Sequence, residues 1–152
     1  IESFKVNHLI LKTGLYVSRK DVFNGVTVTT FDMRFTEPNV EPVMAPCEIH
    51  TIEHLCATFF RNGELKNRVV YFGPMGCRTG FYLVLFGDLS PEEVYPEVKR
   101  AMEFIINFED AIPGATAKEC GNYADQDLGG AKKRAAEYLA RLEKYRAFKY
   151  EE

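Results

Sequence analysis

The sequence predicts an α+β fold in which an antiparallel sheet packs against helices in a single-domain sandwich. Residues 26–35 alternate apolar and polar side chains, the period of two that is typical of a half-buried strand. Two shorter apolar runs, 69–72 and 81–86, lie on either side of a glycine-rich turn. Helical periodicity appears in residues 48–62 and 128–148. Because strands mostly precede helices, the order favours α+β over a doubly wound fold.

The first of these strands, residues 26–35, predicts two faces with different roles. Phe31 and Met33 project to one side and Asp32 and Arg34 to the other, because successive side chains of a strand alternate. Arg34 therefore points away from the core. It is either an ordinary solvated arginine or a charged group aimed at a ligand or partner.

The helices are indicated by their ends as well as by their periodicity. Asn62 and Gly63 supply a stop for the helix 48–62. Ser90, Pro91 and Glu93 form a helix start with a capping serine. Pro96 removes a hydrogen bond inside that helix, so we expect it to begin later or to bend there. The apolar stripe of the helix 48–62 consists of Ile49, Ile52, Cys56, Phe59 and Phe60.

Length and composition narrow the class of protein. A chain of 152 residues suggests one domain, 1–152, and 46% hydrophobic with 27% charged residues is ordinary for a globular protein. A net charge of −3 argues against nucleic-acid and anionic-membrane partners, because no excess of lysine and arginine is present. No apolar run approaches the ~20 residues that span a bilayer, and no signal peptide is visible. We expect a cytoplasmic protein, where unpaired cysteines are common.

Two of the three histidines predict a metal site. His50 and His54 are four residues apart with Glu53 between them, so on a helix both imidazoles reach one face. Glu53 lies on the same side, where a carboxylate can move protons for a substrate. The alternative is a half-exposed helix with surface histidines, but this spacing with an intervening glutamate is improbable by accident.

A third ligand is needed, and the residues alone leave its identity open. Cys56 belongs to the apolar stripe and is better explained as a buried thiol. Cys47 lies three residues before His50 and could share its face of the helix. Cys120 lies in a loop before the last helix, from which a ligand could fold back onto the site.

Cys77 lies in the glycine-rich loop 73–80, which has no Gly-Lys-Ser/Thr and so is not a phosphate cradle. A reactive side chain and a simple turn cysteine are equally consistent with this position.

Three classes of function fit the residues so far. His-x-x-Glu-His is a metallopeptidase signature. A metal-assisted lyase or isomerase of carbonyl compounds would use the same groups. A structural or storage site fits less well, because structural zinc is usually closed by cysteines.

Several segments in order along nearly the whole chain resemble the S-ribosylhomocysteine lyase (LuxS) family. They are Ser3–His8, Phe31–Phe35, His50–Leu55, Pro74–Tyr82 and Glu119–Asn122. The Pro-Met-Gly-Cys block beside His-x-x-Glu-His is specific to this family, and a peptidase would have no need of it. The resemblance implies a cytoplasmic homodimer that cleaves S-ribosylhomocysteine to homocysteine and dihydroxypentanedione, a precursor of a quorum-sensing autoinducer formed in the methyl cycle.

The resemblance also implies roles for single residues, which are carried over by position. His50, His54 and Cys120 match the ligands of one divalent metal per subunit, ferrous iron by preference with zinc or cobalt as substitutes. Glu53 and Cys77 match the general acid/base pair. Positions that contact substrate near the dimer interface are matched by Ser3, His8 and Arg34.

The implied reaction explains why these residue types are needed. The thioether sulfur is not beta to an acidic C–H, so the carbonyl must first migrate along the sugar by two enolisations before beta-elimination expels homocysteine. A Lewis acid and two proton carriers serve such a sequence without an organic cofactor. The chain departs from the family pattern at Gln126, where relatives often carry histidine, and at Tyr71, where they often carry aspartate.

Overall fold

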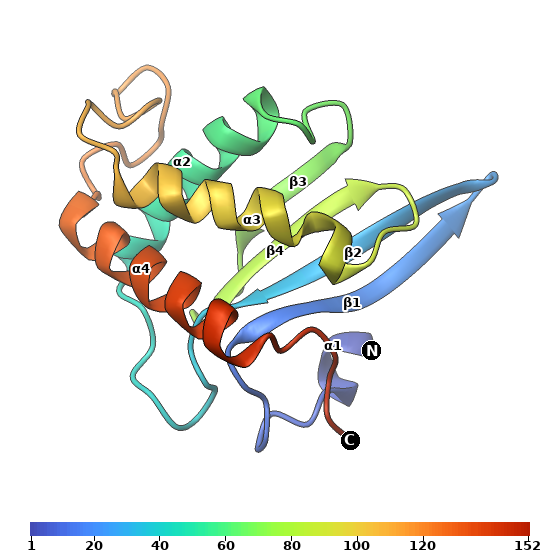
Figure 1. Ribbon diagram of the computed structural model, residues 1–152. Coiled ribbons are helices and arrows are strands. Elements are labelled where there is room, and N and C mark those ends of the chain that lie inside the picture. The colour runs from blue at the N-terminus through green and yellow to red at the C-terminus, as the bar shows by residue number, and fades with distance from the viewer.

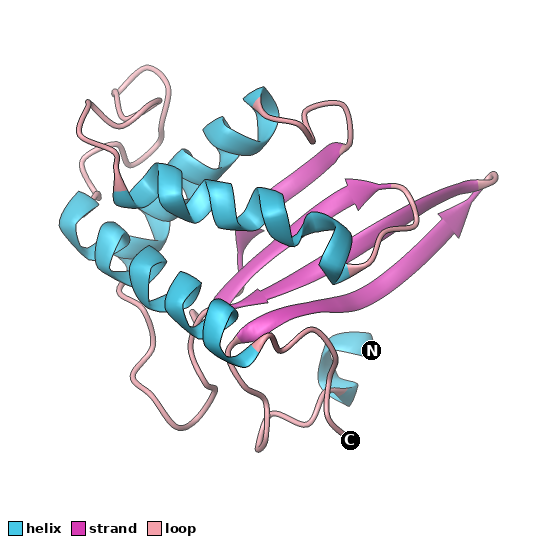
Figure 2. Ribbon diagram, in the orientation of Figure 1, coloured by secondary structure: helices cyan, strands magenta, loops and turns pink.

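The computed structural model describes residues 1–152 and contains one open sheet of four antiparallel strands with four helices (Figures 1 and 2). The strand order is β1-β2-β4-β3. The predicted α+β fold is therefore confirmed. In chain order the elements are α1 (Glu2–Lys5), β1 (Gly14–Phe23), β2 (Val26–Arg34), α2 (Pro46–Asn62), β3 (Val69–Pro74), β4 (Gly80–Phe86), α3 (Pro91–Ile106) and α4 (Leu128–Tyr145).

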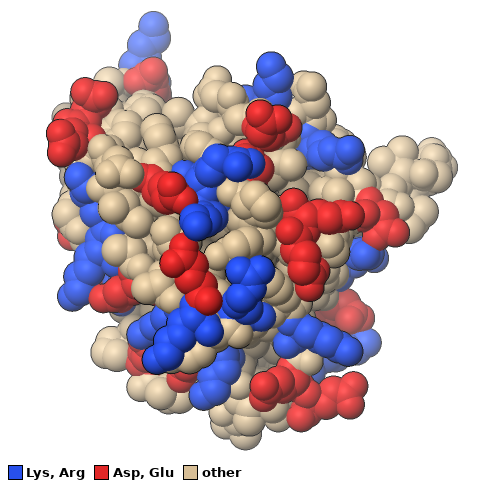
Figure 3. All heavy atoms as spheres, viewed as in Figure 1, with Lys and Arg blue, Asp and Glu red and all other residues tan.

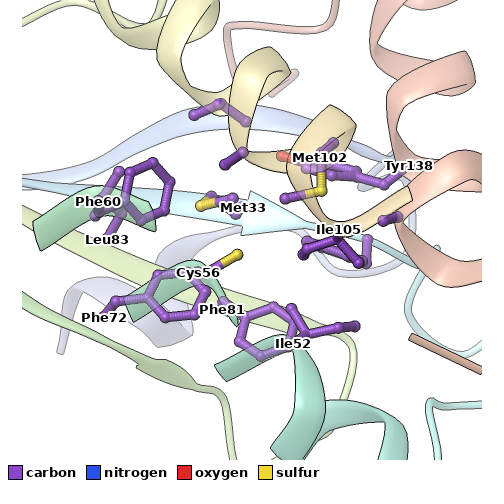
Figure 4. Close-up of a cluster of buried hydrophobic side chains, with 14 of the residues drawn as sticks. Met33, Ile52, Cys56, Phe60, Phe72, Phe81, Leu83, Met102, Ile105 and Tyr138 are labelled. Carbon is purple, nitrogen blue, oxygen red and sulfur yellow. The ribbon is translucent and has the colours of Figure 1, made fainter. Parts of the chain in front are cut away.

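The three long helices cover one face of the sheet and share a single hydrophobic core with it. Strand side chains such as Phe31, Met33 and Phe81 are fully buried there. Figure 4 shows Met33 and Phe81 in the same cluster as Cys56 of α2 and Met102 of α3. Burial of each such side chain contributes about 1.5–3 kcal/mol, so this face dominates the stability of the fold.

The opposite face of the sheet carries no long helix. The register pairs Asp32 with Tyr82 and Thr30 with Val84, so these side chains alternate with the core residues and project away from the helices. Arg34 lies on this same face, as its place in the strand predicts.

β1, at residues 14–23, is the strand that the sequence analysis did not assign. Only its first half is buried, and its second half is exposed together with the start of β2. The two strands form a hairpin that extends beyond the helices (Figure 1). Asn24 and Gly25 make its turn with φ of 50° and 76°, the geometry of a two-residue hairpin loop. Because neither face of the outer half of β1 is buried, its residues do not alternate between apolar and polar, and the pattern that predicts a strand is absent.

The ends of α2 and α3 agree in part with the sequence. α2 begins at Pro46 rather than 48, since the Glu48 carboxylate accepts a hydrogen bond from Ala45 N at 2.7 Å and caps the first turn. α3 begins directly after Ser90 with the predicted capping box, so the alternative of a later start is wrong. The helix continues through Pro96, which is exposed, so the missing hydrogen bond lies on the solvent side.

α4 ends at Tyr145 and not at 148, because Arg146 adopts a left-handed conformation with φ of 47°. Its N–H still donates to Leu142 O at 2.9 Å, which closes the last turn. The remaining residues form a tail that returns toward the start of β1 (Figure 1).

The surface carries both signs of charge. In Figure 3 lysine and arginine side chains alternate with aspartate and glutamate over the visible face, and no large field of one sign appears there. None of the helices combines the length and the apolar character that crossing a membrane requires.

Candidate metal centre

α2 separates its apolar and polar residues onto two faces. Ile52, Leu55 and Cys56 are fully buried in the core, whereas His50, His54 and Glu53 are only half-buried. The half-buried side is approached by the long loop 107–127, which joins α3 to α4 and lies beside α2 in Figure 1. Two histidines and a glutamate of α2 therefore face a loop that lies more than 50 residues later in the sequence.

This loop brings Cys120 to the two histidines. The Nε2 atoms of His50 and His54 are 3.0 Å apart, and Cys120 Sγ is 3.4 Å from His50 Nε2. All three ligand atoms lie within 4.8 Å of one another. Of the two cysteines that the sequence left open as third ligand, the structure brings Cys120 into the cluster, and Cys47 is not among the converging residues.

Main-chain carbonyls of the loop fix both imidazole rings. His50 Nδ1 lies 2.8 Å from Asp125 O, and His54 Nδ1 lies 2.7 Å from Pro113 O. A carbonyl oxygen only accepts, so each Nδ1 carries the proton and donates it. Nε2 of each ring is therefore the atom that faces the cluster and can act as a ligand. This arrangement is the one by which metal-binding histidines are oriented in proteins.

The loop itself is shaped to reach α2. Gly114 has a φ of +72°, and a Cβ there would lie 3.3 Å from His54 Nδ1. A larger residue would be strained and would crowd the imidazole. On the other side of the loop, Cys120 N donates to Thr116 O at 3.0 Å, and the Thr116 hydroxyl donates to Glu119 at 2.7 Å. These turns hold the thiol in place.

The donor set fits a divalent metal ion. Two unprotonated Nε2 atoms at 3.0 Å repel each other unless a cation lies between them, and a thiol beside them adds a third ligand once it is deprotonated. Three protein ligands leave a coordination position free, which distinguishes catalytic from closed structural sites.

Glu53 lies three residues after His50 and one before His54, next to the cluster on the surface of α2. Its carboxylate is half-buried, forms no ion pair and accepts no hydrogen bond. A carboxylate without a fixed partner beside a metal cluster remains available to a substrate.

Gln126 shows what one departure from the family pattern contacts. Its Oε1 accepts a hydrogen bond from Thr51 Oγ1 at 2.7 Å, and its Nε2 lies 3.3 Å from His50 Nδ1. The Thr51 hydroxyl in turn accepts from Asp127 N at 2.9 Å. The departure leaves the ligands unchanged, but it lies directly against one of them. Tyr71, the other departure, is exposed on the helix-free face of the sheet.

Arg34 belongs to a second polar cluster, at the loop between β3 and β4. Its Nε and Nη2 donate to the two oxygens of Asp32 at 3.0 and 2.7 Å, and its Nη1 donates to Thr79 Oγ1 at 2.9 Å. The Arg34 side chain is 4% exposed, so the interpretation as a solvated surface arginine is wrong. Cys77 Sγ lies 4.0 Å from Arg34 Nη1 and 3.1 Å from Thr79 Oγ1.

The second cluster holds a buried cation next to the Cys77 sulfur. Desolvation lowers the pKa of Arg34, but the charge of Asp32 and the hydrogen bonds to it outweigh this and raise the pKa above its ordinary value. The guanidinium is therefore a permanent cation beside an exposed thiol.

The remaining residues expected to contact substrate, Ser3 and His8, lie in the segment before β1. Ser3 is half-buried in the short helix α1 and lines a cavity of about 360 Å³ on the face of the sheet opposite the long helices, together with Tyr71 and Tyr82. His8 is half-buried, and its Nδ1 lies 2.8 Å from Val6 O. No hydrogen bond joins either residue to Arg34 or to the metal cluster.

Sequence reasoning missed the neighbours that hold these side chains. Asp32 shares a strand face with Arg34 two residues later, and this spacing could have indicated the ion pair. Thr79 follows Cys77 in the same loop and gave no separate signal. The carbonyls of Pro113 and Asp125 gave none either, because every residue carries a carbonyl.

Comparisons with known proteins agree with this geometry. The chain matches the S-Ribosylhomocysteinase (LuxS) family over residues 1–148. A protein of Finegoldia magna named S-ribosylhomocysteine lyase is 58% identical over 139 residues, which cover 91% of this chain and 88% of that protein. Proteins of the same name from Clostridium acetobutylicum and Borreliella burgdorferi are 57% and 49% identical, covering 84% and 91% of this chain and 82% and 89% of their own lengths. The chain therefore belongs to the S-ribosylhomocysteinase (LuxS) family.

Proposed function

We propose that this protein is a metal-dependent lyase that cleaves S-ribosylhomocysteine to homocysteine and dihydroxypentanedione, the autoinducer precursor. The observation that carries the proposal is the convergence of His50, His54 and Cys120 beside an unpaired Glu53. Family membership adds the substrate, since relatives that share about half or more of the residues are named for it.

His50, His54 and Cys120 would hold one divalent metal in each subunit. Such an ion supplies Lewis-acid chemistry, polarising the oxygens of a sugar so that adjacent C–H bonds become acidic. Two imidazoles and a thiolate suit ferrous iron, zinc and cobalt alike, and ferrous iron is the member of this set that the family resemblance favours.

Glu53 and Cys77 would move the protons. Carbonyl migration along the ribose needs protons taken from carbon and returned to a neighbouring carbon and oxygen, twice, before the carbon–sulfur bond breaks. Glu53 has a free carboxylate for this work, and Cys77 becomes a base when its thiol is deprotonated. Arg34 Nη1 lies 4.0 Å from the Cys77 sulfur, so both side chains can contact the same bound substrate.

Substrate contacts are proposed at Ser3, His8 and Arg34, close to the interface of a homodimer. The helix-free face of the sheet supports the dimer, because it presents exposed apolar groups that a partner could cover. They include Tyr71 at 52% and Phe86 at 45% exposure. The mixed surface charge favours a small-molecule substrate over a polyanion, so neither nucleic acid nor membrane is expected as a partner.

Four free cysteines are consistent with the cytoplasm, where thiols stay reduced. In that compartment the reaction would serve the methyl cycle and provide the quorum-sensing precursor together.

The proposal is tested by incubating the metal-loaded protein with S-ribosylhomocysteine and measuring homocysteine by chromatography, before and after removal of the metal with a chelator. Homocysteine should appear only with metal present, and added divalent iron, zinc or cobalt should restore it. Peptide substrates should remain uncut. Metal-dependent peptide cleavage without homocysteine release would instead support a peptidase.

A further inference from the structure

The C-terminal tail is fastened to the start of β1 by several contacts. The Arg146 guanidinium lies over the rings of Tyr95 and Phe148 at 4.9 and 5.3 Å. Ala147 O accepts a hydrogen bond from Leu15 N at 2.9 Å. Gly14 makes this approach feasible, because a Cβ there would meet Ala147 O at 2.5 Å. The tail therefore has a defined path, which Figure 1 shows passing β1.

That path ends with Tyr150 inserted at the second polar cluster. Its ring stacks on Tyr16 with centroids 4.5 Å apart and an angle of 20°. Its hydroxyl donates to Asp32 Oδ2 at 2.7 Å. Desolvation first, then the charge of Asp32 and the hydrogen bond to it, raise the pKa of Tyr150, so the hydroxyl remains a donor throughout the neutral range.

Asp32 receives all of its side-chain hydrogen bonds from two residues. Arg34 supplies two and Tyr150 supplies the third. The carboxylate is 1% exposed, so water does not readily replace a lost donor. A planar guanidinium bound through Nε and Nη2 takes its orientation from the carboxylate. The direction of the remaining Nη1, toward Thr79 and Cys77, therefore depends on how Asp32 is held.

We propose that Tyr150 is a positioning residue that holds Asp32 and thereby keeps the Arg34 guanidinium directed at the Cys77 thiol. This rests on the proposed function, in which Arg34 and Cys77 serve the substrate. Tyr150 lies beyond residue 148, where the family match ends. The tail thus supplies to the cluster a hydroxyl from 118 residues away in the sequence.

The test compares Tyr150→Phe with Tyr145→Phe as a matched control. Phenylalanine at 150 keeps the ring that stacks on Tyr16 and removes only the donor. Tyr145 lies at the end of α4, is exposed, and its hydroxyl makes no hydrogen bond. In the metal-loaded proteins, Cys77 is alkylated with iodoacetate and, separately, with iodoacetamide, and each rate is followed by mass spectrometry of the Cys77 peptide.

A cation held beside the sulfur favours the anionic reagent, so the ratio of the two rates reports on Arg34. We expect iodoacetate to be preferred in the wild type and in Tyr145→Phe. The preference should fall about 3- to 10-fold in Tyr150→Phe and should not vanish, because the variant loses the hydrogen bond to Asp32 while Arg34 and Asp32 remain paired. In the lyase assay the KM of Tyr150→Phe should rise more than kcat falls, with metal content unchanged.

An unchanged ratio in Tyr150→Phe, an equal fall in Tyr145→Phe, or no preference in the wild type would each overturn the proposal. The alkylation assay needs no turnover. A wild type without lyase activity would therefore contradict the proposed function. The ratio of the iodoacetate and iodoacetamide rates would still support or overturn the positioning role of Tyr150.

Discussion

The metal cluster and the Arg34–Cys77 cluster are held in different ways. His50 and His54 are oriented by main-chain carbonyls of Pro113 and Asp125, so the path of the loop 107–127 fixes the rings. Arg34 is oriented by side chains alone, from Asp32 and Thr79. A main-chain contact survives most substitutions of the residue that provides it, whereas a side-chain contact does not. The two clusters should therefore respond differently to mutation.

Removing a ligand should have the largest effect, because it affects both binding and catalysis. His50→Ala, His54→Ala and Cys120→Ala should each lose the bound metal and all measurable homocysteine release. Metal content is measured by atomic emission on the purified proteins. Cys47→Ala is the control and should retain metal. If Cys47→Ala loses metal while Cys120→Ala retains it, the third ligand is misassigned.

Cys77→Ala should separate the two clusters. Its thiol contacts Thr79 and Arg34 and forms no hydrogen bond to the metal ligands, so metal content should stay at the wild-type level while homocysteine release is abolished. Cys77→Ser should behave alike, since a hydroxyl is too weak an acid to replace the thiol. Release at the normal rate from Cys77→Ala would refute the acid/base role.

Glu53→Gln should reduce turnover by roughly 10²–10⁴, the usual contribution of one acid/base group. The amide keeps the size of the side chain but cannot exchange the proton. Steady-state kinetics with metal-loaded protein measure the effect, and Glu64→Gln, exposed just after α2, serves as the control. Near-normal turnover would mean that another group carries the proton.

Substitutions of the neighbouring residues Asp125 and Gln126 should have the smallest effects on metal binding. They test directly whether the main chain or a side chain orients His50. Gln126→Ala removes a side chain that packs 3.3 Å from His50 Nδ1, and it should weaken metal binding by at most about 10-fold, because the Asp125 carbonyl still receives the His50 proton. Asp125→Ala keeps the carbonyl that receives the His50 proton and should leave affinity unchanged. Chelator competition measures both. Equal losses would show that the rings do not depend on the main chain.

The sequence predicted what depends on local spacing. The alternation in β2 placed Arg34 opposite the core, and the four-residue spacing placed His50 and His54 on one face of α2. It did not predict β1, whose outer half has no buried side. The contact of Tyr150 with Asp32 could not be predicted from the sequence either, because it depends on the path of the tail after Arg146 ends α4 in a left-handed conformation.

The resemblance and the residues contributed different parts of the site. Cys47 and Cys120 are equivalent by residue type, and in the sequence only the family resemblance favours Cys120. The structure makes the same choice on geometric grounds. The partners of Ser3 and His8 remain predictions, since neither residue is joined to the two clusters within the chain.

Cys56 offers a built-in reporter of how often the core opens. It is fully buried in the core between α2 and the sheet, close to Phe60 and Met33 in Figure 4, and desolvation raises the pKa of its thiol. A thiol reagent in excess can reach it only when α2 separates from the sheet, whereas the other three cysteines are accessible at least in part. The labelling rate of Cys56 then measures the population of opened molecules, and thus the stability of the core in the working enzyme, without any denaturant.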